Sequence, residues 1–316
     1  MISYSNPVWP GYCADPFVLR HDDFYYAYGT GPQDAGGREF VVLKSPDLAH
    51  WEQLNNALEA ALGLENQDHW APEVAFSGGQ FWMYYSADKA NDVSHRLRVA
   101  VADSPAGPFR DCGKELLPDE NGFSIDASPF CDPASGQWYL FFARDYFDKR
   151  IGTGTAMVPL ADDMMTVLDE PREVVRASGD WQIYERERHH YGQVFDRWHT
   201  VEGPFVVWRA ARYYLFYSGG KWESAGYGVS YAVADSPLGP WTDLGDRPHV
   251  LQGTENIIGP GHCSVVLAPD NQTHVCCYHA WNAARTMRQL CVDPIEWTID
   301  GPRVVPTRSG GQLPAG

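Results

Sequence analysis

The sequence predicts an all-β protein, a five-bladed β-propeller in a single domain over residues 1–316. Two observations lead to this prediction. Aromatic residues make up 14% of the chain, which favours β-strands, and one apolar-aromatic pattern recurs five times. Five copies in 316 residues give 316/5, or about 63 residues per unit, enough for the four short strands of a propeller blade. A β-sandwich, the competing fold, gives no reason for a fivefold repeat.

The clearest repeated element is a run of aromatic and apolar residues typical of a buried strand. Its copies begin at Phe24, Phe81, Trp138, Tyr213 and His274. A second predicted strand follows each copy, from Phe40, Leu97, Thr153, Tyr227 and Arg285. A third closes most units, at His50, Gly107, Gly239 and Ile295. A fourth precedes each aromatic run, as ADPFVLR, WAPEVAF, IDASPFC, VEGPFVV and GPGHCSVV. The interval from Asp162 to Val201 is longer than the others, so we expect a loop insertion there that borders a binding site.

The charge balance argues against two classes of partner. Lys and Arg total 24 against 41 Asp and Glu, a net charge of −17 that repels nucleic acid and anionic membranes. Seven cysteines without metal-site spacing give little support to a disulfide framework or a zinc site. Without a signal-peptide pattern or a long apolar stretch, the sequence predicts a cytoplasmic protein with reduced thiols, although a removed leader would leave the same chain.

One polar residue in each unit stands at a similar place on the predicted innermost strand. These residues are Asp15, Glu73, Asp126, Glu202 and His262. Because innermost strands line the channel of a propeller, we expect these side chains to converge at one end, where like charges repel. Stability alone would not select such a set. Taken singly, Asp15 and Asp126 also fit turn residues and His262 fits a hydrogen-bonded core histidine. Glu73 fits a structural role, with its neighbour Trp70 as the functional residue.

Two carboxylates beside a channel mouth are what glycoside hydrolysis requires. One carboxylic acid protonates the leaving oxygen, and a second carboxylate activates water or attacks the anomeric carbon. A third carboxylate near the acid would raise its pKa and keep it protonated at the working pH.

Five ordered motifs make the chain resemble glycoside hydrolase family 43 from about Asn6 to Pro306. They are ADPF (14–17), HWAPE (69–73), IDASPF (125–130), EGPF (202–205) and GPGH (259–262). Similar members of that family are five-bladed propellers that cleave arabinofuranosides or xylosides with inversion. The resemblance implies that Asp15 is the general base, Glu202 the general acid, and Asp126 the carboxylate that orients the acid and tunes its pKa.

The resemblance also implies binding residues. Arg285 falls where similar enzymes place a substrate-binding arginine, and His262 falls beside the channel axis, where a calcium ion is often held through water. No organic cofactor is expected. Trp9, Trp70, Trp222 and Tyr191 are candidates for stacking on a sugar, with a core role as the alternative for each, and Trp70 and Trp222 are the ones we select.

The function predicted from these residues is an inverting, exo-acting α-L-arabinofuranosidase that acts on arabinan or arabino-oligosaccharides. A β-D-xylosidase of the same fold is the nearest alternative, and a catalytically silent carbohydrate-binding propeller is another. Many xylosidases of the family carry a C-terminal β-sandwich that completes the active site. The chain as given ends soon after the fifth unit, which tilts the prediction toward the arabinofuranosidase.

Overall fold

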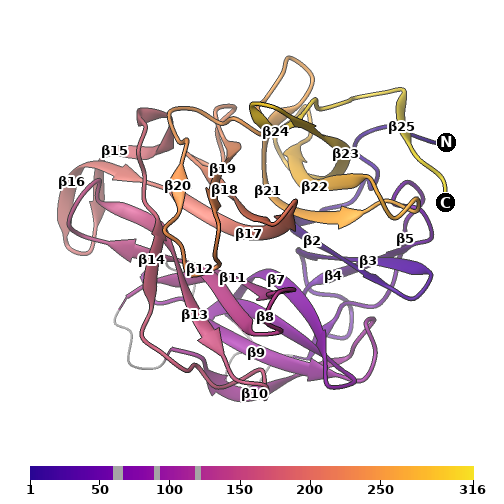
Figure 1. Ribbon diagram of the computed structural model, residues 1–316, viewed down its shortest axis with the longest axis horizontal. Helices are drawn as coiled ribbons and strands as arrows, with labels where there is room; N and C mark the ends of the chain where they lie inside the picture. Colours follow the sequence, from indigo (N-terminus) through magenta and orange to yellow (C-terminus); the bar gives the residue numbers. More distant parts are fainter. Residues whose placement is uncertain (60–66, 89–92, 118–121) are drawn as a thin grey trace.

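The computed structural model describes residues 1–59, 67–88, 93–117 and 122–316. Its sheets form five blades around a central channel, which confirms the predicted all-β, five-bladed propeller (Figure 1). The innermost strands β2, β7, β11, β17 and β21 pack against one another around the ring. Among the described residues, no helix has the length and apolar character needed to cross a membrane.

The first two blades come from the N-terminal half of the chain. Blade 1 contains β2 (Ala14–His21), β3 (Phe24–Thr30), β4 (Val41–Ser45) and β5 (Glu52–Gln53). Blade 2 contains β7 (Asp68–Ser77), β8 (Gln80–Asp88), β9 (Arg96–Ala102) and β10 (Phe109–Glu115), with β6 (Leu58–Glu59) at its outer edge. The aromatic runs form the second strand of each blade. These strands are apolar on both faces because a neighbouring blade covers each face. Tyr84 and Tyr85 are adjacent on β8, point to opposite faces, and are both fully buried.

Blade 3 carries the inserted segment. Its four regular strands are β11 (Ser124–Cys131), β12 (Trp138–Tyr146), β13 (Gly152–Leu160) and β14 (Arg172–Val175). A short 3₁₀ helix, η1 (Asp180–Gln182), then leads into the hairpin of β15 (Ile183–His190) and β16 (Gln193–His199). The hairpin joins the blade where Gly152 of β13 pairs with His199 of β16. The segment expected as a loop insertion is therefore largely an ordered β-hairpin.

Blades 4 and 5 complete the ring. Blade 4 contains β17 (Val201–Arg209), β18 (Arg212–Gly219), β19 (Gly228–Ala234) and β20 (Thr242–Asp243). Blade 5 contains β21 (Ile258–Leu267), β22 (His274–Trp281), β23 (Arg288–Thr298) and β24 (Gly301–Val304). The outer strand predicted at Ile295 is wrong, because residues 295–298 continue β23 and the outer strand begins at Gly301.

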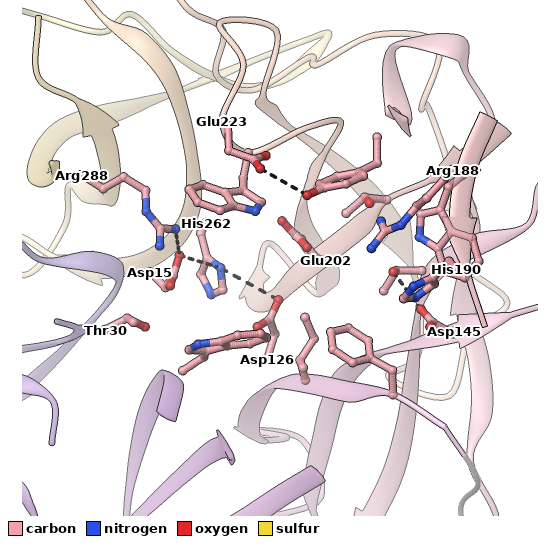
Figure 2. A pocket seen from close by; sticks show the side chains of 18 of the residues that line it. Asp15, Thr30, Asp126, Asp145, Arg188, His190, Glu202, Glu223, His262 and Arg288 are labelled. Atoms are coloured by element: carbon pink, nitrogen blue, oxygen red, sulfur yellow. Dashed lines mark hydrogen bonds and ion pairs between the residues drawn. The ribbon is translucent and has the colours of Figure 1, made fainter. Parts of the chain in front are cut away.

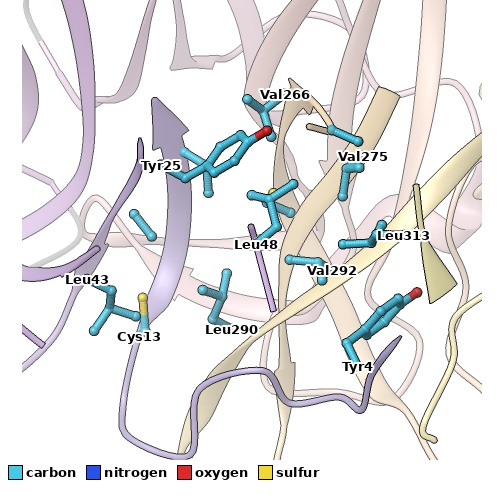
Figure 3. Close-up of a cluster of buried hydrophobic side chains, with 14 of the residues drawn as sticks. Tyr4, Cys13, Tyr25, Leu43, Leu48, Val266, Val275, Leu290, Val292 and Leu313 are labelled. Atoms are coloured by element: carbon cyan, nitrogen blue, oxygen red, sulfur yellow. The ribbon is translucent and has the colours of Figure 1, made fainter. Parts of the chain in front are cut away.

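The chain ends meet beside blade 5. Strand β1 (Ile2–Tyr4) pairs antiparallel with β25 (Gly311–Leu313). The buried Asn6 amide donates to the Val292 carbonyl at 3.0 Å and to the Asp293 carboxylate at 2.9 Å. Tyr4 and Leu313 pack into the apolar cluster between blades 5 and 1, together with Tyr25, Leu43, Val275 and Val292 (Figure 3). The N-terminal segment thus fastens the last blade to the first.

Every innermost strand has a shift in register near its N-terminal end. The shifts lie at 14–17, 70–73, 125–128, 202–205 and 261–264. Such β-bulges bend a strand and re-aim its side chains. Because all five lie at the same end of the channel, they shape one common surface there.

Candidate active site

A cavity of about 440 Å³ lies where the N-terminal ends of the innermost strands meet (Figure 2). Six of the seven residues selected from the sequence line it: Asp15, Trp70, Asp126, Glu202, Trp222 and His262. The seventh, Arg285, does not. The three carboxylates come from blades 1, 3 and 4 and are drawn together from distant parts of the chain.

The bulges determine which inner-strand side chains enter the cavity. Asp15, Asp126 and His262 have φ of 49°, 59° and 48°, in the left-handed region. Glu202 reaches the cavity one position earlier in its bulge, because Gly203 takes the left-handed conformation with φ of 56°. Glu73 follows its bulge, is buried outside the cavity lining, and burial raises its pKa well above the ordinary value. The expectation that Glu73 joins the other carboxylates at the channel mouth is therefore wrong.

Asp15 is held by positive and polar neighbours. Arg288 Nη1 lies 2.8 Å from its Oδ1, His279 Nδ1 lies 3.3 Å away, and His262 Nδ1 lies 3.5 Å away. Burial alone would raise the pKa of Asp15, but the positive charge of Arg288 outweighs it and holds the pKa far below its usual range. These contacts therefore favour the ionised, carboxylate form of Asp15.

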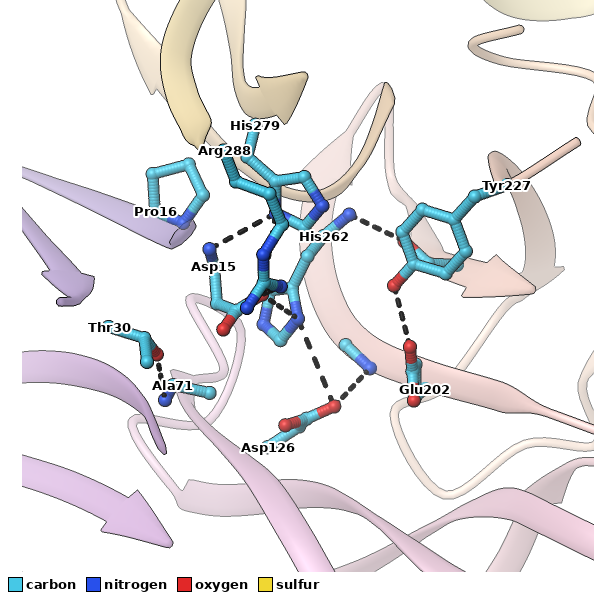
Figure 4. A network of polar contacts seen from close by, with 12 residues as sticks. Asp15, Pro16, Thr30, Ala71, Asp126, Glu202, Tyr227, His262, His279 and Arg288 are labelled. Atoms are coloured by element: carbon cyan, nitrogen blue, oxygen red, sulfur yellow. Dashed lines mark hydrogen bonds and ion pairs between the residues drawn. The ribbon is translucent and has the colours of Figure 1, made fainter. Parts of the chain in front are cut away.

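Glu202 lies in a different electrostatic environment. The Tyr227 hydroxyl is 2.7 Å from Oε1 of Glu202 (Figure 4). Burial and the negative charges of Asp15 and Glu223 raise the pKa of Glu202 to about 7, although Tyr227 and Arg288 oppose the shift. Glu202 can therefore hold a proton near neutral pH, where Asp15 cannot.

Asp126 interacts with a backbone amide. The Gly203 N–H donates to Oδ2 of Asp126 at 2.9 Å. Burial and the charges of Glu202 and Asp15 raise the pKa of Asp126 well above its ordinary value, and the Gly203 N–H opposes that shift. Because an ionised carboxylate disfavours ionisation of its neighbour, Asp126 and Glu202 are accommodated more easily with one proton between them than with both groups ionised.

His262 lies between two carboxylates instead of facing a set of metal ligands. Its Nδ1 is 3.5 Å from Asp15 Oδ1 and 3.9 Å from Asp126 Oδ2, and burial lowers its pKa. In the part of the chain that the structure describes, no three His, Cys, Asp or Glu side chains are arranged to hold a metal ion. These residues do not fit a directly bound metal, and calcium held through water stays a prediction.

Two of the four aromatic candidates border the cavity. Trp70 stacks on His95 with ring centroids 3.6 Å apart, and Trp222 stacks on Trp281 at 5.7 Å. Both line the cavity. Trp9 packs instead against the apolar cluster between blades 5 and 1. Tyr191 donates a hydrogen bond to Asp145 at 2.7 Å and supports the wall without lining it.

The arginine of blade 5 was predicted three residues too early. Arg285 is exposed in the turn between β22 and β23, where its N–H donates to the Asn282 carbonyl and its φ is 53°. Strand β23 begins at Arg288, whose guanidinium lies 4.5 Å from the Trp222 ring and ion-pairs with Asp15. The placement of Arg285 is wrong because the turn extends to residue 287.

Several cavity residues were not selected individually from the sequence. The inserted hairpin and the residue after it supply Tyr184, Arg188, His190, Trp198 and Thr200. Arg188 lies over the rings of Tyr184 and Trp198, at 4.6 and 5.2 Å from their centroids. The expected insertion thus borders the cavity as predicted, and its unusual length was the available signal. Tyr12 and Glu223 lie just outside the repeated motifs and could not be selected from them.

Comparisons with known proteins agree with this geometry. The sequence model of glycosyl hydrolases family 43 matches residues 4–302. The crystal structure of a thermostable family-43 glycoside hydrolase superposes with a TM-score of 0.85 and 31% identity, covering 99% of this chain and 100% of that one. The structure of an α-L-arabinofuranosidase from Lactobacillus brevis shares the fold, with a TM-score of 0.76, 22% identity, and coverage of 96% and 98%.

Curated relatives with different specificities are also similar. The β-D-galactofuranosidase xynD of Aspergillus niger is 28% identical over 94% of this chain and 86% of its own length. An extracellular exo-α-(1→5)-L-arabinofuranosidase of Streptomyces avermitilis is 24% identical over 95% of this chain and 62% of its own. With the family model matched over nearly all of its length and the fold shared, the chain belongs to glycoside hydrolase family 43.

Proposed function

We propose that this glycoside hydrolase is an inverting, exo-acting α-L-arabinofuranosidase that releases arabinose from arabinan or arabino-oligosaccharides. The observation that supports this most strongly is the contrast between two carboxyl groups in one cavity. Arg288 keeps Asp15 ionised, whereas burial and neighbouring charge raise the pKa of Glu202 to about 7. An ionised base and a protonated acid on either side of one bond are the pair that hydrolysis with inversion requires.

In this mechanism Glu202 is the general acid. Tyr227 occupies Oε1 of Glu202, which leaves the other carboxyl oxygen to deliver its proton to the departing glycosidic oxygen. Asp15 takes a proton from the water that attacks the anomeric carbon. Its ion pair with Arg288 fixes Oδ1 and keeps the carboxylate charged until it accepts that proton, which it then releases to solvent before the next turnover.

Asp126 helps to keep the general acid, Glu202, protonated. An ionised Asp126 makes loss of the Glu202 proton unfavourable, because two adjacent buried carboxylates cannot both ionise at low cost. An isolated glutamate has a pKa of about 4.3. Glu202 therefore stays protonated to a higher pH than an isolated glutamate does. After each turnover the same repulsion helps Glu202 to recover a proton.

The walls of the cavity favour a terminal sugar. Trp70 and Trp222 offer aromatic faces, and the inserted hairpin adds Arg188 and Trp198 to the lining of the cavity. Release of one residue from a chain end requires a cavity that encloses the terminal sugar and stays open toward the departing chain, and a cavity of about 440 Å³ has room for a sugar ring. A catalytically silent binding propeller is disfavoured, because such a protein has no need for three carboxylates with opposed proton affinities.

A second candidate is a β-D-galactofuranosidase, which the similarity to the enzyme of Aspergillus niger favours. β-D-Galactofuranose has the ring stereochemistry of α-L-arabinofuranose and adds one hydroxymethyl group to the exocyclic carbon. One cavity could accept both sugars if it had room for that group. The β-D-xylosidase alternative requires a pyranose ring of different shape.

Comparing para-nitrophenyl glycosides tests the proposal directly. We expect kcat/KM for α-L-arabinofuranoside to exceed that for β-D-galactofuranoside, and both to exceed that for β-D-xyloside, by about tenfold at each step, because a misfitting group costs about 1–3 kcal/mol. Asp15→Ala is the control that separates this activity from a contaminant, because water activation is needed whatever the leaving group. The highest kcat/KM on the xyloside, or no hydrolysis of any of the three, would overturn the proposal.

The two arginines of blade 5 provide a matched pair of variants. Arg288→Gln should lower kcat/KM by about 100-fold, since it leaves Asp15 buried without its counter-charge. Arg285→Gln changes an exposed turn residue and should stay within about twofold of wild type. Steady-state kinetics and thermal melting of both variants check this. Equal losses of activity would mean that Arg288 has no special role.

Asp126→Asn tests how the acid is kept protonated. With the neighbouring negative charge gone, the pKa of Glu202 falls, so the protonated acid is lost at lower pH. We expect lower activity and an alkaline limb of the kcat/KM profile displaced downward by about one pH unit. The profile is measured from pH 4 to 9 against wild type. An alkaline limb that stays in place would assign Asp126 to substrate orientation alone.

A further inference from the structure

At each inner-strand bulge, one residue in the left-handed conformation turns its N–H away from the neighbouring strand. These residues are Asp15, Ala71, Asp126, Gly203 and His262, with φ of 49°, 48°, 59°, 56° and 48°. A buried N–H that leaves the ladder needs another acceptor. Four blades supply the same kind of acceptor for this N–H, and blade 3 does not.

Four blades use the same solution. The N–H donates to a side chain on the second strand of the preceding blade: Ala71 to Thr30 at 2.9 Å, Asp126 to Ser86 at 3.0 Å, His262 to Ser218 at 2.7 Å and Asp15 to His279 at 3.1 Å. All four acceptors occupy one register, opposite the residue that precedes the bulge residue of their own blade: Ala14–Thr30, Trp70–Ser86, Glu202–Ser218 and Gly261–His279.

The third blade departs from this pattern. The residue at the same register is Ala143, which pairs with Ile125 and is fully buried. Its methyl group cannot accept a hydrogen bond. The amide that would have used it, the Gly203 N–H, donates instead to Oδ2 of Asp126 at 2.9 Å (Figure 4). Blade 3 thus lacks the acceptor at this register, and the amide that it would have bound donates to an active-site carboxylate instead.

We propose that Ala143 is a positioning residue: because it offers no acceptor, it directs the Gly203 amide onto Asp126, and so makes Asp126 the ionised member of the Asp126–Glu202 pair. This inference rests on the proposed function, in which Glu202 must carry the shared proton. Ala143 does not line the cavity, although it packs in one cluster with Phe123 and Ile125, which do. In this proposal it acts on the active site through Gly203 and Asp126.

The electrostatic surroundings explain why a single amide matters. The titratable and charged groups around Asp126 are Glu202, Asp15, Glu73, His262, Arg288 and Tyr227. Three of these are carboxyl groups, and burial disfavours the charged form of His262. Arg288 is committed to Asp15 at 2.8 Å. The hydrogen bond from the Gly203 N–H is therefore a charge-assisted bond to a buried carboxylate that has few other groups to stabilise its charge.

Gly203 itself cannot serve as the test residue. A Cβ at this position would approach the His262 ring at 3.2 Å, so a side chain there would disturb His262 as well as the amide. Ala143 is the better residue to change, since two other blades already accommodate serine at this register, at Ser86 and Ser218. Serine should therefore fit, and it supplies the hydroxyl that blade 3 lacks.

In Ala143→Ser, the new hydroxyl competes with Asp126 for the Gly203 amide. Asp126 then binds a proton more readily, so the form with ionised Asp126 and protonated Glu202 is lost earlier as the pH falls. We expect the acidic limb of the kcat/KM profile to rise by about half to one pH unit, and the plateau to fall about three- to tenfold. This differs from Asp126→Asn, which moves the alkaline limb. A crystal structure of the variant should show the hydroxyl within about 3.2 Å of Gly203 N.

Two controls separate this effect from simple disturbance of the core. Ala156→Ser buries a hydroxyl in the same blade, on the neighbouring strand β13, and should leave the acidic limb in place even if it lowers the melting temperature. Adding Ala143→Ser to Asp126→Asn should produce no further shift, because the residue through which it acts is gone.

The outcomes keep the two proposals apart. Absence of hydrolysis by wild-type protein would overturn the proposed function. An active wild type, together with an unmoved acidic limb in Ala143→Ser, would overturn this inference alone. A shift of equal size in Ala156→Ser, or one that persists in the Asp126→Asn background, would also overturn it.

Discussion

Mutual repulsion among buried carboxylates is the constraint around which this active site is built. Asp15, Asp126 and Glu202 share one cavity, and each has a different partner: Arg288, the Gly203 amide and the Tyr227 hydroxyl. A full positive charge, a fixed dipole and a neutral hydroxyl stabilise a carboxylate to different degrees. Three chemically similar groups thereby acquire different proton affinities, and the division into base, acid and tuning residue follows from their surroundings.

The propeller is what makes these partners available. Each carboxylate stands at a bulge on an innermost strand, and the groups that fix it come from other parts of the ring. Arg288 of blade 5 reaches Asp15 of blade 1, and Gly203 of blade 4 reaches Asp126 of blade 3. These contacts depend on closure of the ring, which the β1–β25 pair and Asn6 secure at the seam. The distance between acid and base is thus set by the packing of whole blades.

The sequence was a good guide to the blades and a poorer guide to the register within them. Aromatic runs repeat because both faces of the second strand are buried, so the fivefold pattern is visible in the sequence. A bulge, however, shifts the register locally, and this separates Glu73 from the other carboxylates and leaves Trp70 in the cavity. A turn longer than expected likewise exchanges Arg285 for Arg288.

The hairpin structure of the insertion and the acceptors of the bulge amides could not be predicted from the sequence, and the reasons differ from those above. Strand β15 reads IYERERHH and is largely exposed, so it lacks the apolar alternation that indicates a strand. The acceptor register of Thr30, Ser86, Ser218 and His279 consists of small or common polar residues whose relation appears only when the blades are aligned in space. The exception at Ala143 is visible only against that alignment.

The central claim is that Asp15 acts on water and not on the sugar. Asp15 and Glu202 belong to blades 1 and 4, with blade 5 between them, an arrangement that suits the separation of about 6.5–9.5 Å required for an intervening water better than the 5–5.5 Å of a nucleophile. Proton NMR of the first product formed from an α-L-arabinofuranoside, recorded before mutarotation, tests this directly. The account predicts β-L-arabinofuranose as that product, and the α-anomer appearing first would contradict it.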